Sequence, residues 1–265
     1  MRSAQRAGQS EFFKGAAVPR PLCGDYGAAG VMSRTIIIGD LHGCAAELDA
    51  LLERIAHAAG DRVYCVGDLV ARGPDGMGVL RILRQVGARS VLGNHDAKLR
   101  AIRPRKGKKP VDKVPNALAG VYDKLKSEDW DLFDALPLYL DLPEHELRIV
   151  HAGVVPKVPI DEQDPWVLTN LRSFDEAGKP SSKWNEVTWA ATYHERPHIV
   201  FGHDARSRLQ IHECATGIDT GCVYGAELTA LVLPAATPAP SRAERRDVLF
   251  SVPARAAYAD LNAGS

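Results

Sequence analysis

Side chains able to bind metals and transfer protons recur in five short clusters of this sequence, each directly after an apolar run. The clusters are GDLHG (39–43), GDLVARGPD (67–75), GNHD (93–96), HAGV (151–154) and FGHD (201–204). The side chains predicted to stand at the strand ends are Asp40, Asp68, Asn94, His42, His95, His151 and His203. Nitrogen and oxygen donors without a thiolate suit borderline divalent cations. The five clusters together therefore predict a metal site.

Each cluster taken alone has a simpler explanation. A Gly-Asp pair after a strand is usually a turn or a helix cap, because Asp and Asn bond readily to their own backbone. A lone histidine at a strand end is usually a surface or core residue. Turns do not explain why the same plan occurs five times. The neighbouring glycines would also let the backbone come close to a ligand.

The segments between the first three clusters predict alternating strands and helices. TIIIGD (35–40), RVYCVGD (62–68) and RSVLGNHD (89–96) have the apolar character of buried strands. Apolar residues at helical spacing fill the intervening stretches 44–60 and 77–87. This βαβαβ order implies parallel strands, and ligands bind at the carboxyl ends of such strands. Three of the cluster residues fall at those ends: Asp40, Asp68 and Asn94.

The rest of the chain divides into further predicted elements. The stretch 114–137 is expected to be helical, and strands are predicted at 138–143, 147–153 and 198–204. Residues 217–234 contain two apolar runs with glycines between them, a pattern typical of a β-hairpin.

Changes in composition suggest where the domain begins and ends. Residues 1–32 are rich in Gly and Ala without a period, and predict a disordered extension. Residues 33–234 hold all five clusters and predict one domain. Residues 235–265 begin with a Pro- and Ala-rich linker and include an apolar stretch expected to add an edge strand. The basic stretch 103–113 predicts a solvated loop, or one that lies near a phosphate-rich substrate.

The overall composition argues against several classes of protein. Lys and Arg together number 33, as do Asp and Glu, so no net charge attracts the chain to nucleic acid. The five cysteines form no CxxC pair. Neither a disulfide framework nor a thiolate zinc site is therefore expected, and a cytoplasmic location fits. No apolar run approaches the ~20 residues that span a bilayer, and residues 1–30 lack the apolar core of a secretory signal.

The five clusters in this order resemble the signature set of the PPP-type metallophosphoesterases, the superfamily of calcineurin-like phosphatases. The resemblance extends over roughly residues 34–232. It implies an α/β fold in which a central β-sandwich is flanked by helices (αββα). It also implies two divalent metal ions, most commonly Mn, with Fe, Zn or Co as alternatives.

The resemblance gives a role to each matching residue. The implied metal ligands are Asp40 and His42 on one ion, Asp68 between the ions, and Asn94, His151 and His203 on the other. His95 matches the residue proposed as general acid, and Arg72 matches an arginine that grips the phosphate. In the implied mechanism, a hydroxide that bridges the ions attacks phosphorus in line. Arg72 would neutralise the phosphoryl oxygens, and a pKa near neutrality would suit His95 to protonate the leaving oxygen.

Two positions depart from the protein-phosphatase pattern. Ala71 stands where those enzymes have an aspartate that pairs with the catalytic histidine, and Asp96 stands where they have glutamate. Asp96 is counted with the catalytic residues, and whether it helps to hold His95 is left open. Both departures resemble the bacterial symmetrical diadenosine tetraphosphatases, the ApaH group. In that group the stretch matching 168–174 carries a substrate-facing arginine, so the resemblance implies that Arg172 is a second phosphate clamp.

Several other residues have two explanations each. Tyr224 is equally suited to the core and to the substrate pocket, where its ring would stack on a base. Asp204 and Asp219 are candidates either for orienting the histidines or for forming turns. Cys44 is expected to pack as a small residue. Core packing is expected for three aromatic residues: Trp184, Trp189 and Tyr193.

The resemblance to the ApaH group implies hydrolysis of dinucleoside polyphosphates, with diadenosine tetraphosphate giving two ADP. The segment between HAGV and FGHD is shorter than that group leads us to expect. A serine/threonine-type protein phosphatase or a broad phosphomonoesterase is therefore the alternative. A catalytically inactive nucleotide-binding protein is an alternative of another class, which the filled ligand positions argue against. The expected partner is a nucleotide or another phosphorylated substrate, without a membrane or a stable nucleic-acid complex, and the oligomeric state is left open.

Overall fold

Three consecutive isoleucines begin the first sheet, and their alternation shows how the molecule is layered. In β1 (Thr35–Ile38), Ile36 and Ile38 pack among the side chains of helices, whereas Ile37 packs with residues of a second sheet. Successive side chains of a strand point to opposite faces of its sheet. A strand that is apolar at every position is therefore one that is covered on both faces.

The computed structural model of the chain describes residues 33–104 and 112–261. These residues belong to one compact unit, Met32–Ser265. The extension predicted at 1–32 and most of the basic loop predicted at 103–113 lie outside the described residues. None of the helices within the described ranges is long and apolar enough to cross a lipid bilayer.

The first sheet has five strands in the order β12-β11-β1-β2-β3. β1 runs parallel to β2 (Arg62–Cys65), which runs parallel to β3 (Arg89–Ser90). The crossovers contain α1 (Ala45–Arg54) and α2 (Gly76–Gln85). The predicted βαβαβ unit is therefore confirmed, and it brings the carboxyl ends of these three strands to one edge.

A second sheet of five strands packs against the first, in the order β4-β5-β8-β10-β9. Its strands are β4 (Tyr139–Leu142), β5 (Leu147–Val150), β8 (His198–Phe201), β9 (Gln210–Ile211) and β10 (Ala215–Gly217). Side chains from both sheets, including Tyr64, Ile149 and Val200, form one buried apolar cluster. This cluster is the interior of a β-sandwich.

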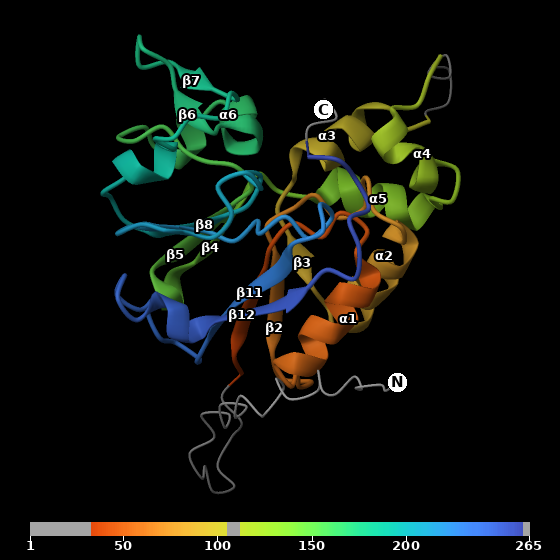
Figure 1. The fold of residues 1–265 in the computed structure, drawn as a ribbon, viewed down its shortest axis with the longest axis horizontal. Helices are drawn as coiled ribbons and strands as arrows, with labels where there is room; N and C mark the ends of the chain where they lie inside the picture. The colour runs from red at the N-terminus through yellow and green to blue at the C-terminus, as the bar shows by residue number, and fades with distance from the viewer. Residues whose placement is uncertain (1–32, 105–111, 262–265) are drawn as a thin grey trace, which may run out of the picture. The chain divides into compact units, whose positions relative to one another are not determined.

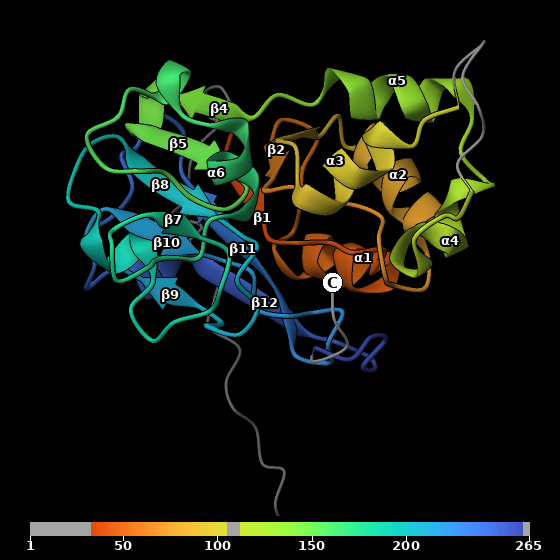
Figure 2. The same ribbon diagram turned by 90° about the horizontal axis from the view of Figure 1, so that it is seen from above.

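Helices cover the other face of the first sheet, as the views from two directions show (Figures 1 and 2). Leu48 of α1 and Val79 of α2 are fully buried in the cluster that joins these helices to the sheet. The region predicted to be helical at 114–137 forms two separate helices. The remaining helices on this side are α3 (Asn94–Ala101), α4 (Asn116–Tyr122) and α5 (Ser127–Ala135).

A smaller layer covers the outer face of the second sheet. Val150, Ile199 and Phe201 of that sheet pack with Leu168 and Trp189 from the connection between β5 and β8. That connection contains α6 (Pro165–Asn170) and the two-stranded sheet of β6 (Ser173–Phe174) and β7 (Pro180–Ser181). The short 3-10 helices are η1 (Pro143–His145), η2 (Ile160–Glu162), η3 (Trp189–Thr192) and η4 (Arg245–Val248). The layers confirm the predicted αββα class.

The β-hairpin predicted at 217–234 is wrong. β10 pairs in parallel with β8 in the second sheet, whereas β11 (Glu227–Leu233) pairs antiparallel with β1 in the first. Residues 218–226 form a glycine-containing connection rather than the first strand of a hairpin, and this connection leads from the second sheet to the first. β12 (Leu249–Pro253) pairs with β11 at the edge of the first sheet. Part of the segment predicted as a tail at 235–265 therefore contributes a strand.

Candidate active site and metal centre

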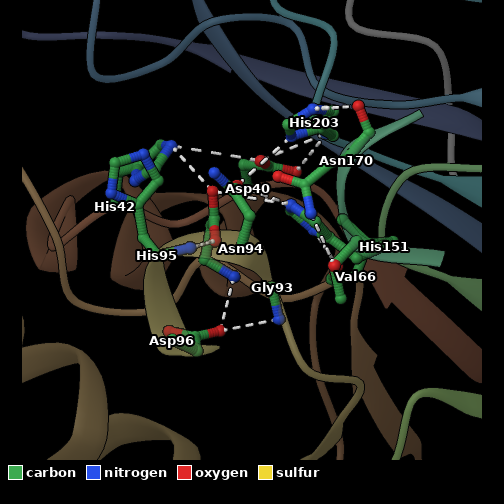
Figure 3. A network of polar contacts seen from close by, with 12 residues as sticks. Asp40, His42, Val66, Gly93, Asn94, His95, Asp96, His151, Asn170 and His203 are labelled. Atoms are coloured by element: carbon green, nitrogen blue, oxygen red, sulfur yellow. Dashed lines mark hydrogen bonds and ion pairs between the residues drawn. The ribbon is translucent and has the colours of Figure 1, made fainter. Parts of the chain in front are cut away.

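The polar residues that follow the strands of both sheets meet at one end of the sandwich (Figure 3). Asp40 follows β1, Asn94 begins α3 just after β3, and His203 follows β8. The first and second sheets thus contribute to the same site. All of the predicted metal ligands are buried: Asp40, His42, Asp68, Asn94, His151 and His203.

The carboxylate of Asp68 lies between two imidazoles. Its Oδ2 is 3.5 Å from Nε2 of His42 and 3.6 Å from Nε2 of His151. Asp40 Oδ2 is 4.0 Å from the same His42 nitrogen. One ligand atom each from Asp40, His42 and Asp68 fit within 4.8 Å of one another. This spacing allows a single cation to contact all three side chains.

Backbone carbonyls determine which nitrogen of two histidines carries the proton. Nδ1 of His151 donates to the carbonyl oxygen of Val66 at 2.7 Å, and Nε2 of His203 donates to that of Asn170 at 3.2 Å. A carbonyl oxygen can only accept, so the other ring nitrogen of each neutral histidine has a free lone pair. Both of those nitrogens lie 3.2 Å from Oδ1 of Asn94. Carbonyl partners of this kind orient histidine ligands in metal sites.

Burial keeps these histidines neutral. It lowers the pKa of His151 to about 4, and it lowers that of His203 well below its ordinary value. Burial likewise lowers the pKa of His42 to about 3, with the charge of Arg72 as the next cause. Neutral imidazole is the form that binds metals. The lone pairs of the neutral histidines face the carboxylates, and a divalent cation fits this donor set.

The pKa values of the carboxylates shift in the opposite direction, upward from their ordinary values. Burial, then the charges of Asp219 and Asp68, raises the pKa of Asp40 well above its ordinary value. Burial raises the pKa of Asp68 to about 7. Anions held close together in a poorly solvated site repel, and a bound cation would remove this repulsion.

Glycines allow the carboxylates to approach the neighbouring clusters. A Cβ atom on Gly202 would lie 1.9 Å from Oδ1 of Asp40, and one on Gly93 would lie 2.2 Å from Oδ1 of Asp68. His203, which follows Gly202, donates its backbone N–H to Asp40 at 3.2 Å. Gly93 and Gly202 are therefore each required by the close approach of a carboxylate from a different cluster.

Left-handed backbone conformations are concentrated at the site. His42, Asp68, Arg72 and His203 have φ angles of 43°, 52°, 71° and 67°. Such conformations cost about 1–3 kcal/mol each for residues other than glycine, and they cluster at functional sites. The strain indicates that the surrounding fold holds these four side chains in place.

His95 lies beside the buried ligands and contacts Arg72. Its Nε2 is 3.4 Å from Nε and 3.3 Å from Nη2 of Arg72, so the guanidinium donates to the imidazole. Its Nδ1 is buried without a hydrogen-bond partner. Burial lowers the pKa of His95, with the charges of His42 and Arg72 as further causes. The rings of His42 and His95 meet edge to face at 5.3 Å, and the guanidinium of Arg72 lies 5.8 Å from the ring of Tyr224.

Asp96 contacts the backbone rather than the ring of His95. Its carboxylate accepts hydrogen bonds from the backbone N–H groups of Asp68 at 2.8 Å, Leu69 at 3.1 Å and Gly93 at 3.1 Å. These contacts join the segments after β2 and β3. They favour a positioning role for Asp96 over the direct catalytic role predicted from the sequence, which stays a prediction.

Arg172 is tied to carbonyl oxygens beside the site. Its Nη2 donates to the carbonyl of His203 and its Nη1 to that of Ser182, each at 3.0 Å. Its Nε lies 3.9 Å from Oδ1 of Asp204. The predicted phosphate clamp is therefore next to a candidate metal ligand, and its guanidinium would have to change partners to reach a substrate.

Several contributors to the site have a weak signal in the sequence or none. Val66 and Asn170 act through backbone carbonyls, which no side-chain pattern reveals. Asp219 follows β10 on the same strand-then-carboxylate plan, is buried, and has its pKa raised to about 7 by burial.

Trp189 and Tyr193 are core residues as predicted, whereas Trp184 is 48% exposed. The core prediction for Trp184 is wrong because its indole N–H bonds Ser207 at the surface.

A β-sandwich with buried nitrogen and oxygen donors at the end of its strands defines the class of metallophosphoesterases. Residues 33–229 match the family model for calcineurin-like phosphoesterases. The chain therefore belongs to the calcineurin-like phosphoesterase family. This finding confirms the resemblance seen in the five clusters.

Known relatives carry names that refer to dinucleotide hydrolysis. The asymmetrical bis(5'-nucleosyl)-tetraphosphatase of Oceanobacillus iheyensis is 32% identical over 75% of this chain and 88% of its own length. The symmetrical enzyme of Shewanella baltica is 40% identical over 56% of this chain and 51% of its own length. A crystal structure of a candidate diadenosine tetraphosphatase, 33% identical, superposes with a TM-score of 0.70 over 84% of this chain and 95% of that one.

Proposed function

We propose that the protein hydrolyses a phosphoanhydride bond of dinucleoside tetraphosphates, converting diadenosine tetraphosphate to two ADP. The observation that carries this proposal is the convergence of nitrogen and oxygen donor atoms from six buried side chains at the end of the sandwich. The names of the relatives support the substrate class, and membership of the family supports the reaction class.

Two divalent cations, with Mn as the first candidate, are proposed to occupy this centre. Asp40 and His42 would hold one, Asn94, His151 and His203 the other, and Asp68 would contact both. When bound, the ions polarise the phosphoryl group and activate water for in-line attack. The protein itself would fix the lone pairs toward the ions through the carbonyls that hold His151 and His203.

Arg72 and His95 are proposed to handle the charge and the proton of the reaction. The guanidinium of Arg72 already donates toward Nε2 of His95, so a phosphoryl oxygen could replace that nitrogen as its partner. Nε2 of His95 would then be free to carry a proton to the leaving oxygen. The negative charge of the bound phosphates would favour the protonated imidazole, opposing the effect of burial on the pKa of His95.

Two further residues are proposed to bind the substrate. Arg172 lies beside His203 and would contact a phosphate beyond the cleavage point. Tyr224 has its ring 6.4 Å from that of His42 and close to Arg72, which places an aromatic face next to the proposed phosphate site. Aromatic faces of this kind bind nucleobases by stacking.

Asymmetrical cleavage, which gives ATP and AMP, is the second candidate. It is favoured by the extent of the similarity, because the asymmetrical relative matches 75% of this chain and the symmetrical one 56%. The two reactions need the same chemistry at phosphorus and differ only in how far the polyphosphate extends past the metal centre.

Product analysis distinguishes these functions. The purified protein with Mn²⁺ and diadenosine tetraphosphate is expected to yield ADP as the only product on ion-exchange chromatography. Equal amounts of ATP and AMP would select the second candidate. Hydrolysis of phosphopeptides or p-nitrophenyl phosphate without dinucleotide turnover would overturn both. The Asp68→Asn variant, which removes the charge shared between the ions, is the inactive control.

A further inference from the structure

A second group of metal-binding side chains, separate from the centre above, is formed by Cys44, Glu47 and Cys222. One ligand atom from each lies within 4.8 Å of the other two. Their exposed fractions are 0%, 1% and 2%. Cys44 and Glu47 stand at the start of α1, and Cys222 stands in the connection that crosses from β10 to β11. The sequence contains no CxxC pair, so the spacing of the cysteines does not reveal this cluster.

The carboxylate of Glu47 has one satisfied oxygen and one without a partner. Oε1 accepts the backbone N–H of Arg255 at 2.9 Å and the hydroxyl of Tyr258 at 2.8 Å. Oε2 is buried and has no hydrogen-bond partner. A buried carboxylate oxygen left unpaired is unfavourable, because it has lost its water without gaining a donor. This second oxygen is therefore free to bind a cation.

The start of α1 favours anionic ligands at this point. Cys44 is the N-cap residue of the helix, makes no side-chain capping bond, and is followed by Glu47 in the first turn. The positive end of a helix stabilises a carboxylate in its first turn, such as that of Glu47. The carbonyl oxygen of His42 lies 3.9 Å from Sγ of Cys44 and is available as a fourth ligand atom for a metal ion.

We propose that Cys44, Glu47 and Cys222 bind a thiophilic divalent cation of the Zn²⁺ type. Two sulfurs and one oxygen form a softer donor set than the nitrogen and oxygen atoms of the first centre, so the two sites would select different ions. Binding forms two metal–sulfur bonds and one metal–oxygen bond, and the two thiol protons pass to solvent. The bound ion joins α1 to the β10–β11 connection and, through Glu47, to Arg255 and Tyr258 near the end of the chain.

Cobalt is the probe that separates this site from the first. A Co²⁺–thiolate bond gives an intense charge-transfer band in the near ultraviolet, which a centre of nitrogen and oxygen ligands does not give. Titration of the metal-free full-length protein is expected to produce this band, and Zn²⁺ is expected to abolish it by displacement. The band is expected to persist in Asp68→Asn, in which the first centre is disabled, so the outcome does not depend on the proposed function.

Substitutions test which side chains bind. Cys222→Ser is expected to lose the band, whereas Cys214→Ser, at a buried cysteine outside the cluster, is expected to keep it. Glu47→Gln keeps both thiols and is expected to weaken Zn²⁺ binding at least about 10-fold, measured by competition with a chromophoric chelator. This variant also serves as the test if Cys222→Ser does not fold. No band in the wild type, or unchanged Zn²⁺ affinity in Glu47→Gln, would overturn the proposal.

Discussion

The carboxylate of Asp96 accepts a hydrogen bond from the backbone N–H of Asp68 at 2.8 Å. Asp68 in turn accepts the backbone N–H of His95 at 2.9 Å through its own carboxylate. The segments after β2 and β3 are therefore linked in both directions. Asp96 is adjacent in sequence to His95, the proposed general acid, but its carboxylate contacts the backbone of Asp68, the proposed bridging residue.

Replacing Asp96 with Asn should disturb the position of Asp68 without removing a reacting group. An amide oxygen accepts two hydrogen bonds at most, so one of the three N–H groups loses its partner. We expect the free energy of unfolding to fall by about 1–3 kcal/mol, the usual effect of one buried unsatisfied donor. Urea denaturation measures this loss. Activity should fall by the same factor for good and poor leaving groups, and a loss that depends on the leaving group would indicate direct catalysis.

Replacing His95 with Ala tests the proton-donor role. We expect the turnover number to fall about 10²–10⁴-fold for a nucleotide substrate, the usual contribution of positioned acid catalysis. The loss should be smaller with p-nitrophenyl phosphate, because p-nitrophenolate leaves readily without a proton. His194→Ala, at an exposed histidine, is the matched control. Equal losses for the two substrates would contradict the proposed role.

Replacing Asp68 with Asn should have opposite effects on stability with and without metal. The pKa of Asp68 is raised to about 7, above its value of about 3.9 in an unfolded chain. A raised carboxyl pKa means that the native state binds more protons, so metal-free protein loses stability as the pH rises from about 4 to 7.

The neutral amide removes this effect of Asp68. Without metal at pH 8, Asp68→Asn should therefore melt at a higher temperature than the wild type. With excess Mn²⁺ the order should reverse, because the wild type gains more binding energy. Calorimetry with and without a chelator measures both, and a variant less stable in both conditions would contradict the inference that burial makes ionised Asp68 unfavourable in the metal-free site.

The positions of the first site residues could be predicted because they depend on local patterns. Asp40, Asp68 and Asn94 each follow an apolar strand, and the βαβαβ order brings such strand ends together. Periodicity and polar clusters are sufficient for this much. Gly93, which precedes Asn94, is also visible in the sequence. Only the structure shows that the close approach of Asp68 requires a glycine there.

Other features depend on contacts between distant segments. The run at 227–233 pairs with β1 rather than with its neighbour in sequence, and no local signal distinguishes these partners. Trp184 is as apolar as Trp189, but only Trp189 has an acceptor in the core, the carbonyl of Ala152. Cys44, at the start of α1, and Cys222, in the connection between β10 and β11, come together although they are far apart in the sequence. Sequence patterns indicate which residues can be buried, whereas tertiary packing decides which are.

His198 provides a test of pH-dependent stability away from the candidate active site. Its Nε2 lies 2.6 Å from Nη1 of the buried Arg245, which therefore donates to a neutral imidazole. Burial, followed by the charge of Arg245, lowers the pKa of His198 to about 3. The unfolded chain, with a pKa near 6.5, then binds a proton that the native state does not. Native stability should therefore fall as the pH drops from about 6.5 toward 3, by about 1.4 kcal/mol per pH unit for this residue.

The His198→Gln variant isolates this contribution, because glutamine keeps an acceptor for Arg245 but does not titrate. Urea unfolding of wild type and variant at pH 7.5 and 5.0 measures it. We expect the variant to be less stable than the wild type at pH 7.5, since the imidazole fits its site, and to lose less stability on acidification. Other buried histidines titrate in both proteins, so only the difference between the two slopes reports His198. Identical slopes would show that the protonated imidazole is tolerated beside Arg245.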